Sequence, residues 1–264
     1  MEKPQILLTN DDGIASPGLW AAAKALSALG YVTVAAPREQ HSGAGRSVPA
    51  WSDGEIKPTQ LMIGDQEWTC YAMGGSPAQS AQMGILQVLR RKPDLVVSGI
   101  NYGENPATDI TLSGTVGAAL EAASVGIPAL AVSLQLANED YLGHSKDTDF
   151  SAAAFFTAKF AKVLLDKKMP SDVHALNVNI PINATPETPW KVTRLGRHSY
   201  FVAYLKEVDG QSRIDAGPSP HPEDLADPST DVHAMRVENV VSVTPLSLDL
   251  TSRVDLEDLQ TLLK

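Results

Sequence analysis

The sequence contains two adjacent carboxylates, Asp11 and Asp12, which together could bind a cation. They follow a short apolar run over residues 6–9 and precede Gly13. Neighbouring acids repel each other, and a cation, a shared proton or full solvation relieves that repulsion. Taken alone, the pair fits a solvated turn or a helix cap about as well as an ion site. Its position directly after a predicted strand favours the ion site.

Two other polar segments also follow predicted strands. They are Gln40-His41-Ser42-Gly43 and Ser98-Gly99-Ile100-Asn101. In an open parallel sheet, the loops beyond the carboxyl ends of neighbouring strands converge on one ligand site. Carboxylate, hydroxyl and amide oxygens are hard ligands that suit Mg²⁺, Mn²⁺ or Ca²⁺, and no Cys or His cluster in the sequence indicates structural zinc. The three loops together predict a divalent-cation site.

The segment Ser113-Gly114-Thr115-Val116-Gly117 is predicted to begin a helix. A helix N-terminus carries unpaired N–H groups and partial positive charge, and glycine lets an anion approach the backbone. The segment alone is better explained as a serine N-cap with glycines chosen for packing. Combined with the acidic loops, however, it predicts a phosphoryl site. The first loop lacks G-x-G-x-x-G, and its carboxylates would repel a pyrophosphate, so we do not expect dinucleotide binding.

Alternating strands and helices must position these loops. Periodicity and turn residues predict strands over 6–9, 31–36, 94–98, 129–134, 175–180 and 240–245, and helices over 17–29, 76–91, 113–124, 151–165 and 256–263. Short apolar strands that alternate with helices indicate an α/β fold whose mostly parallel sheet is covered on both faces.

Composition and net charge indicate a globular protein and argue against some classes of partner. Hydrophobic residues make up 43% of the 264 residues and charged residues 20%, as in ordinary globular domains. The formal net charge of −10 argues against a nucleic-acid polymer or an anionic membrane as the partner. The single cysteine, Cys70, agrees with a reducing compartment. No signal peptide and no apolar run of transmembrane length is evident, so we expect a cytoplasmic protein.

We divide the chain into a catalytic α/β core over residues 1–190, a β-rich arm over 191–238, and a return strand with a C-terminal helix over 239–264. The arm has little apolar sequence with which to build a core of its own, and a lone hairpin is marginally stable. Alternation would place apolar side chains on both of its faces, so we expect the arm to lie against a second copy of the protein. The residues in question are Tyr200, Val202 and Tyr204 on one face and Phe201, Ala203 and Leu205 on the other.

The sequence resembles the SurE family, a stationary-phase survival protein that acts as a 5′/3′-nucleotidase. The resemblance is carried by ILLTNDDG (6–13), PREQHSG (37–43), LVVSGINYG (95–103), SGTVGAA (113–119) and VSVTP (241–245). It implies a three-layer, Rossmann-like α/β fold and hydrolysis of nucleoside 5′- and 3′-monophosphates. It also implies one divalent cation per subunit, Mg²⁺ or Mn²⁺, a homodimer or homotetramer and, in some members, activity on short polyphosphate.

The resemblance implies specific site residues. The metal ligands fall on Asp11, Asp12, Ser42 and Asn101, and one of the two aspartates would orient the attacking water. For phosphate binding we expect Asn10, Gly43, Ser113, Gly114 and Thr115. Departures from the family pattern are His41 in place of an amide, Ser76 in place of Thr, and a segment over 106–109 that is less glycine-rich. These departures concern substrate preference and loop shape rather than the metal ligands.

Two other functions fit the acidic pair less well. A phosphoaspartyl phosphatase normally separates its two aspartates by one residue, whereas Asp11 and Asp12 are adjacent. A receiver-like regulatory module without turnover needs an acid at the end of a central strand, where this chain has Asn101. Hydrolysis with a metal-activated water is therefore the predicted reaction.

Overall fold

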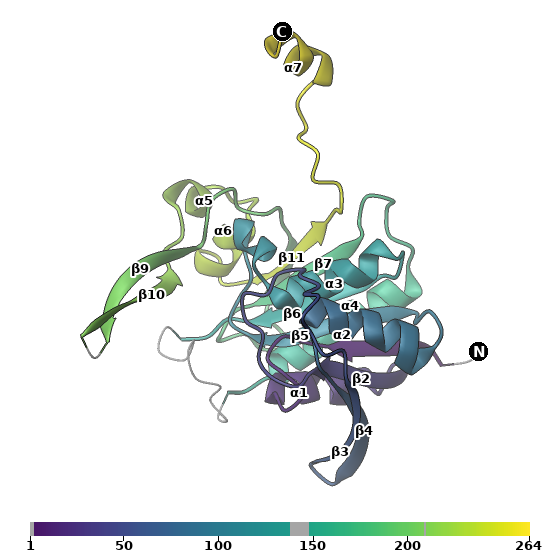
Figure 1. Cartoon of the computed structure of the whole chain (residues 1–264). Helices are drawn as coiled ribbons and strands as arrows, with labels where there is room; N and C mark the ends of the chain where they lie inside the picture. Colours follow the sequence, from purple (N-terminus) through teal and green to yellow (C-terminus); the bar gives the residue numbers. More distant parts are fainter. Residues whose placement is uncertain (1–2, 138–147, 209) are drawn as a thin grey trace.

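A central sheet of nine strands organises the protein, in the order β3-β4-β2-β1-β5-β6-β7-β11-β8 (Figure 1). The computed structural model describes residues 3–137, 148–208 and 210–264. The strands of this sheet are β1 (Gln5–Thr9), β2 (Tyr31–Pro37), β3 (Ile56–Ile63), β4 (Gln66–Met73), β5 (Leu95–Tyr102), β6 (Ala129–Leu134), β7 (Ala175–Ile180), β8 (Trp190–Val192) and β11 (Val241–Leu246). A separate hairpin consists of β9 (Phe201–Val208) and β10 (Gln211–Pro218).

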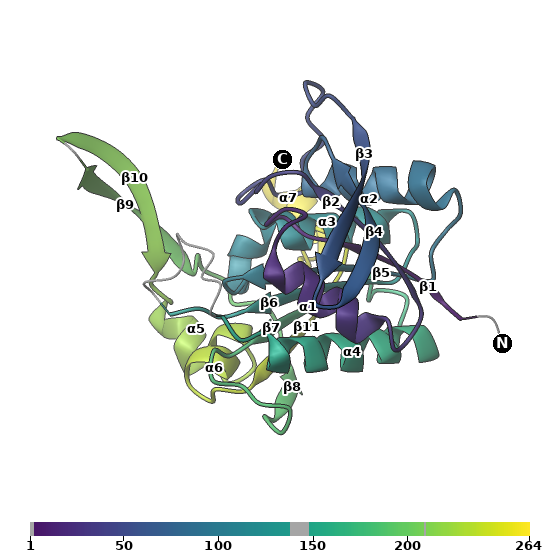
Figure 2. The same ribbon diagram turned by 90° about the horizontal axis from the view of Figure 1, so that it is seen from below.

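Helices cover both faces of the sheet (Figures 1 and 2). The helical elements of the described residues are α1 (Pro17–Leu26), α2 (Pro77–Met83), the π-helix η1 (Gly84–Leu89), the 3₁₀-helix η2 (Ala107–Thr111), α3 (Gly114–Ser124), α4 (Ser151–Asp166), α5 (Pro222–Ala226), α6 (Asp231–Arg236) and α7 (Leu256–Leu262). None of these helices combines the length and apolar character needed to cross a membrane.

Two apolar layers hold the helices to the sheet. On one face α1 and α4 pack together, with Leu19 and Phe156 in the larger buried cluster. On the other face α2 packs against α3, with Val116 and Ala119 in a second cluster. The pairs β3–β4 and β7–β11 are antiparallel, and the other pairs of this sheet are parallel. The predicted three-layer, mostly parallel α/β fold is confirmed.

The strand β1 lies at the point where the chain changes direction across the sheet. It pairs in parallel with β2 on one side and with β5 on the other. The connection from β1 to β2 passes through α1, which covers one face, while the chain enters β5 from α2 and η1, which cover the other. Connections that diverge in this way leave a crevice beyond the carboxyl end of the strand, where ligands bind.

Most predicted helices begin at the expected residues because local signals specify them. Pro17 occupies the first turn of α1, and Ser76 with Gln79 forms a capping box at the start of α2. The helix predicted over 76–91 is interrupted, since α2 passes into the π-helix η1, which ends at Arg90 with a positive φ. The structure also contains the β3–β4 hairpin and the short helix α5, neither of which we predicted.

The arm differs from its predicted extent. The strand β8 pairs with β11 in the central sheet, and within the predicted arm the β9–β10 hairpin is the part that projects from the body (Figures 1 and 2). Tyr200, which we predicted on one face of the arm, is instead buried against Ala107 and Val232 at the root of the hairpin. Its backbone N–H donates to Asp109 Oδ2 at 2.8 Å. Burial of a tyrosine ring among these neighbours anchors the hairpin to the core.

Candidate active site

The two carboxylates lie at the carboxyl end of β1 and are both buried, with 4% of Asp11 and 7% of Asp12 exposed. A different element contacts each of them. The hydroxyl of Thr115, in the first turn of α3, donates to Asp11 Oδ1. The backbone N–H of Tyr102, at the end of β5, donates to Asp12 Oδ2 at 3.2 Å. The pair is therefore oriented by two segments far away in the sequence.

Burial of these two charges is unfavourable without a counter-charge. Loss of solvation, followed by repulsion from Asp12, raises the pKa of Asp11 to about 7, although the hydrogen bond from Thr115 opposes the rise. Burial and the charge of Asp12 likewise raise the pKa of Tyr102 to about 12. A divalent cation between the two carboxylates would reverse the sign of the local field.

The Ser42 loop is joined to β1 and to the segment before α3. The backbone N–H of His41 donates to the Asp11 carbonyl at 2.7 Å, and that of Gly45 donates to the Leu112 carbonyl at 2.9 Å. Gln40 Nε2 donates to Ser42 Oγ at 2.8 Å, which orients the hydroxyl. Gly43 adopts a φ of 74° with open space around its Cα. Ser42 thus comes next to Asp11 through the backbone of its neighbour.

Asn101 reaches the same end of the sheet from β5. Its Nδ2 donates to the carbonyls of Gly103 at 2.7 Å and Tyr102 at 3.2 Å. These two bonds determine the orientation of the amide, whose Oδ1 is its acceptor atom. The pairing of β5 with β6 is irregular between Ser98 and Asn101, where Gly99 has a φ of 129°. This irregularity sets the direction in which the Asn101 side chain leaves the strand.

The start of α3 packs directly on Asp11. A Cβ added to Gly114 would lie 2.8 Å from Asp11 Cβ and 2.9 Å from its Oδ2, so only glycine fits at this position without displacement of the carboxylate. Ser113 Oγ accepts the N–H of Val116 at 3.1 Å as an N-cap. The Ser113 and Thr115 hydroxyls therefore contact protein groups here, and the role of these residues in phosphate binding stays a prediction.

Several buried polar atoms near β1 have no hydrogen-bond partner among the described residues. They include Thr9 Oγ1, Asn10 Oδ1 and Ser98 Oγ. Asn10 Nδ2 donates to the Gly13 carbonyl at 3.0 Å, and Thr9 is the register partner of Ser98. Because buried polar atoms are nearly always paired, several unpaired ones at one end of a sheet indicate an ion, a ligand or water there. Hard oxygen donors that lack partners fit a divalent cation.

A cavity of about 260 Å³ opens beside the Ser42 loop. Its walls include Arg38, His41, Trp51 and Gly75, and Arg38 is paired with Asp53 and Glu55. The cavity lies at the carboxyl ends of β2 and β4, the strands next to β1 on that side. A ligand bound among the loops at the carboxyl end of β1 would therefore have room to extend into this cavity.

Arg46, which follows the Ser42 loop, forms an ion pair with Glu121 of α3 at 2.7 Å.

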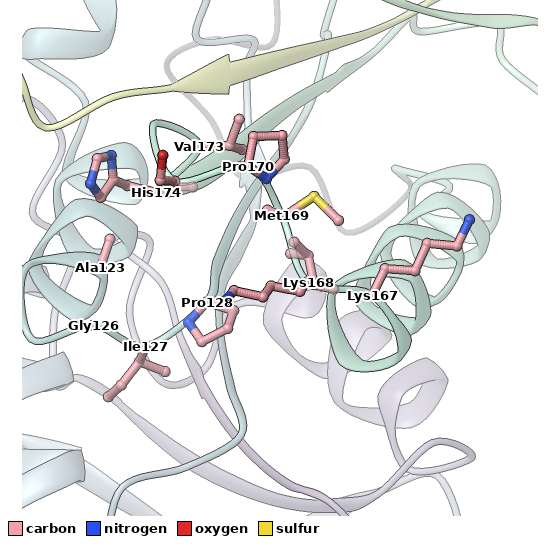
Figure 3. Close-up of a pocket in the computed structure, with 13 residues that line it drawn as sticks. Ala123, Gly126, Ile127, Pro128, Lys167, Lys168, Met169, Pro170, Val173 and His174 are labelled. Atoms are coloured by element: carbon pink, nitrogen blue, oxygen red, sulfur yellow. The ribbon is translucent and has the colours of Figure 1, made fainter.

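A second cavity, also of about 260 Å³, contains none of the predicted site residues (Figure 3). Pro128 and His174 line it just before β6 and β7, and Lys167 and Lys168 border it at the end of α4. It thus lies at the amino ends of the parallel strands, whereas the acidic pair lies at the carboxyl end.

Sequence reasoning missed two contacts of the acidic pair. The Tyr102 N–H on Asp12 and the Thr115 hydroxyl on Asp11 had no local signal in the sequence. Tyr102 follows Asn101 directly, and Thr115 was assigned only to phosphate. Both contacts depend on how β5 and α3 are placed next to β1.

The chain is similar to known proteins over nearly its whole length. The family model described as survival protein SurE matches residues 6–202. The 5′-nucleotidase SurE of Methanosarcina mazei is 40% identical over 269 residues, covering 97% of each chain. The 5′-nucleotidase SurE of Thermococcus kodakarensis is 39% identical and covers 98% of each.

A solved structure shares the fold. The crystal structure of the SurE protein from Aquifex aeolicus matches with a TM-score of 0.76 and 34% identity, over 99% of this chain and 100% of that one. The solved structure thus shares the α/β fold described above, and the relatives cover nearly the whole chain. This chain belongs to the SurE family.

Proposed function

We propose that this protein is a metal-dependent phosphomonoesterase that hydrolyses nucleoside 5′-monophosphates, and also 3′-monophosphates, to nucleoside and phosphate. The observation that carries the proposal is the buried Asp11–Asp12 pair beside hard oxygen donors at the end of β1. Full-length relatives named 5′-nucleotidase support the substrate class. The single cysteine supports a cytoplasmic location.

Asp11, Asp12, Ser42 and Asn101 would hold one divalent cation per subunit, Mg²⁺ or Mn²⁺. Such a cation supplies Lewis acidity, because it polarises a phosphoryl oxygen and lowers the pKa of a water. One of the two carboxylates would orient that water. The nucleoside would lie in the cavity lined by His41 and Trp51.

Asn10, Gly43 and Gly114 remain the proposed backbone and amide contacts to phosphate, with Ser113 and Thr115 at the start of α3. A receiver-like module without turnover is less well supported, because Asn101 stands where a phosphoacceptor acid would be required.

Chelation is expected to reduce phosphate release to background, and added Mg²⁺ or Mn²⁺ should restore it. The measurement is steady-state phosphate release from a panel of nucleoside 5′- and 3′-monophosphates, with tripolyphosphate as a further substrate. Undiminished turnover by metal-free protein would contradict the metal proposal. Release of at most one equivalent of phosphate per chain would instead indicate a phosphoacceptor or a binding module.

We also propose that the protein is a homodimer or a pair of dimers in which the β9–β10 hairpin contacts a second copy. Leu205 and Ile214 are cross-strand partners on this hairpin and are 73% and 81% exposed. The helix α7 also extends from the body on a long segment, with Leu256 and Leu262 exposed (Figure 1). Exposed apolar pairs on projecting elements support a contact with a partner surface.

Tyr204→Asp combined with Leu205→Asp is expected to weaken the dimer at least tenfold, because burial of one large apolar side chain contributes about 1.5–3 kcal/mol. Light scattering over a concentration series measures the shift. The matched control is Gln211→Asp with Ser212→Asp, which adds equal charge to the same hairpin without removing apolar surface. A wild-type protein that is a folded, fully active monomer at micromolar concentration would refute the proposal.

A further inference from the structure

Two histidines and a glutamate that are distant in the sequence meet at the root of the β9–β10 hairpin. His198 precedes β9, whereas His221 and Glu223 follow β10 at the start of α5. Each offers one ligand atom, and these atoms all lie within 4.8 Å of one another. The two imidazole rings stack, with centroids 3.7 Å apart and planes inclined by 14°. None of these residues belongs to the acidic site at β1.

A buried carboxylate orients the first histidine. Asp224 Oδ2 lies 3.2 Å from His198 Nδ1, and Asp224 also accepts the N–H groups of Arg197 at 2.9 Å and His198 at 3.0 Å. Burial opposes ionisation of Asp224, but these hydrogen bonds outweigh it and hold its pKa below the usual range. An ionised carboxylate on Nδ1 favours a proton there and leaves Nε2 with its lone pair.

Glu223 lies near the other ring nitrogen of His198. His198 Nε2 lies 3.7 Å from Glu223 Oε2. A histidine that donates one ring nitrogen to a carboxylate and offers the other as a ligand is the usual arrangement around protein-bound metals. His221 supplies the second imidazole. Its Nδ1 accepts the Glu223 N–H in a long bond of 3.3 Å, which a small ring movement would release.

We propose that His198, His221 and Glu223 bind a divalent transition-metal ion, with Zn²⁺ as the representative case. Two imidazole nitrogens and one carboxylate oxygen form a donor set that suits Zn²⁺ better than Mg²⁺, which prefers oxygen ligands. The all-oxygen site at β1 and this nitrogen-rich site would thus select different ions. Three protein ligands leave one position of a tetrahedral ion for water.

Binding requires the stacked rings to rotate. Bonds of about 2.0–2.1 Å to a tetrahedral ion place neighbouring ligand atoms about 3.3 Å apart. In the structure the three ligand atoms lie within 4.8 Å of one another, so they must move closer together. The side chains have room for this movement, since 78% of Glu223 and 36% of His198 are exposed. The ion would join the segment that enters the hairpin to the segment that leaves it, and so would restrain the root of the hairpin.

Zinc binding can be measured separately from the ion at β1. Calorimetric titration of chelator-treated, full-length Asp11→Asn/Asp12→Asn protein with Zn²⁺ should show one ion per chain. In this background His198→Ala with His221→Ala should weaken binding at least a hundredfold, and Glu223→Gln should weaken it about tenfold, on the scale expected when ligands of a metal site are removed. Co²⁺ bound in place of Zn²⁺ should give the visible absorption of a four-coordinate ion, and the double histidine variant should lose that absorption.

The matched control is His174→Ala, which removes a histidine from the opposite end of the sheet and should bind Zn²⁺ like its parent. Circular dichroism establishes that each variant is folded. The proposal is overturned if the background protein binds no Zn²⁺ at millimolar concentration. It is also overturned if the histidine variants bind Zn²⁺ as tightly as the control.

Discussion

Asp11→Asn and Asp12→Asn are each expected to lower kcat/KM by roughly a hundredfold or more, the scale on which loss of one electrostatic catalytic group falls. The amide keeps the shape of the side chain and an oxygen acceptor but loses the negative charge that would hold the cation. Asparagine can still accept the Tyr102 N–H at position 12 or the Thr115 hydroxyl at position 11. The local fold should therefore persist, and the loss should appear in activity and in metal affinity.

The same two substitutions should maintain or raise the stability of the metal-free protein, even though they lower its activity. In the metal-free protein, burial and like charge raise the pKa of Asp11 to about 7, above its unfolded value. Such a group contributes stability below its unfolded pKa and loses that contribution as the pH rises through 7. At pH 8 both amide variants should therefore unfold at a denaturant concentration equal to or higher than that of the wild type. Asp65→Asn, in the exposed β3–β4 turn, is the control and should change neither property. Full activity in both variants would move the catalytic site elsewhere.

Gly114→Val is expected to reduce activity about a hundredfold, because a displacement of roughly 1 Å at a reacting centre commonly costs that much. The reason is steric. The new Cβ would lie 2.8 Å from Asp11 Cβ and 3.0 Å from Pro77 Cγ, so the valine must push the carboxylate or move α3. The measurements are phosphate release and the midpoint of urea unfolding on the same preparation.

Ala122→Val is the matched control, because it adds bulk to the same helix at a buried position in the apolar cluster of Val116 and Ala119. Both variants should be destabilised by about 1–3 kcal/mol, the usual cost of extra carbon atoms in a packed core. Only Gly114→Val should lose activity beyond that common effect. If it retains the activity of the control, or fails to fold, the glycine serves packing alone.

The sequence by itself determined the fold class and the loops that carry the site. The strands over 129–134 and 175–180 were predicted to the residue, because continuous apolar runs bounded by turn residues leave few alternatives. Local cap signals at Ser76 and Ser113 determined where two helices begin. The positions of Asp11, Asp12, Ser42 and Asn101 after predicted strands together predicted an acidic site at the carboxyl edge of the sheet.

Tertiary structure alone decided how those loops meet. The Thr115 hydroxyl lies on Asp11 because the start of α3 lies at the carboxyl end of β1, and no local pattern reports a contact between residues so far apart. Tyr200 is buried rather than exposed on the arm because it packs against Ala107 and Val232. His198 and His221 meet only because the β9–β10 hairpin returns the chain to its own starting point. Periodicity encodes which face of an element is apolar, whereas the choice of neighbour depends on contacts between distant segments that a single sequence does not display.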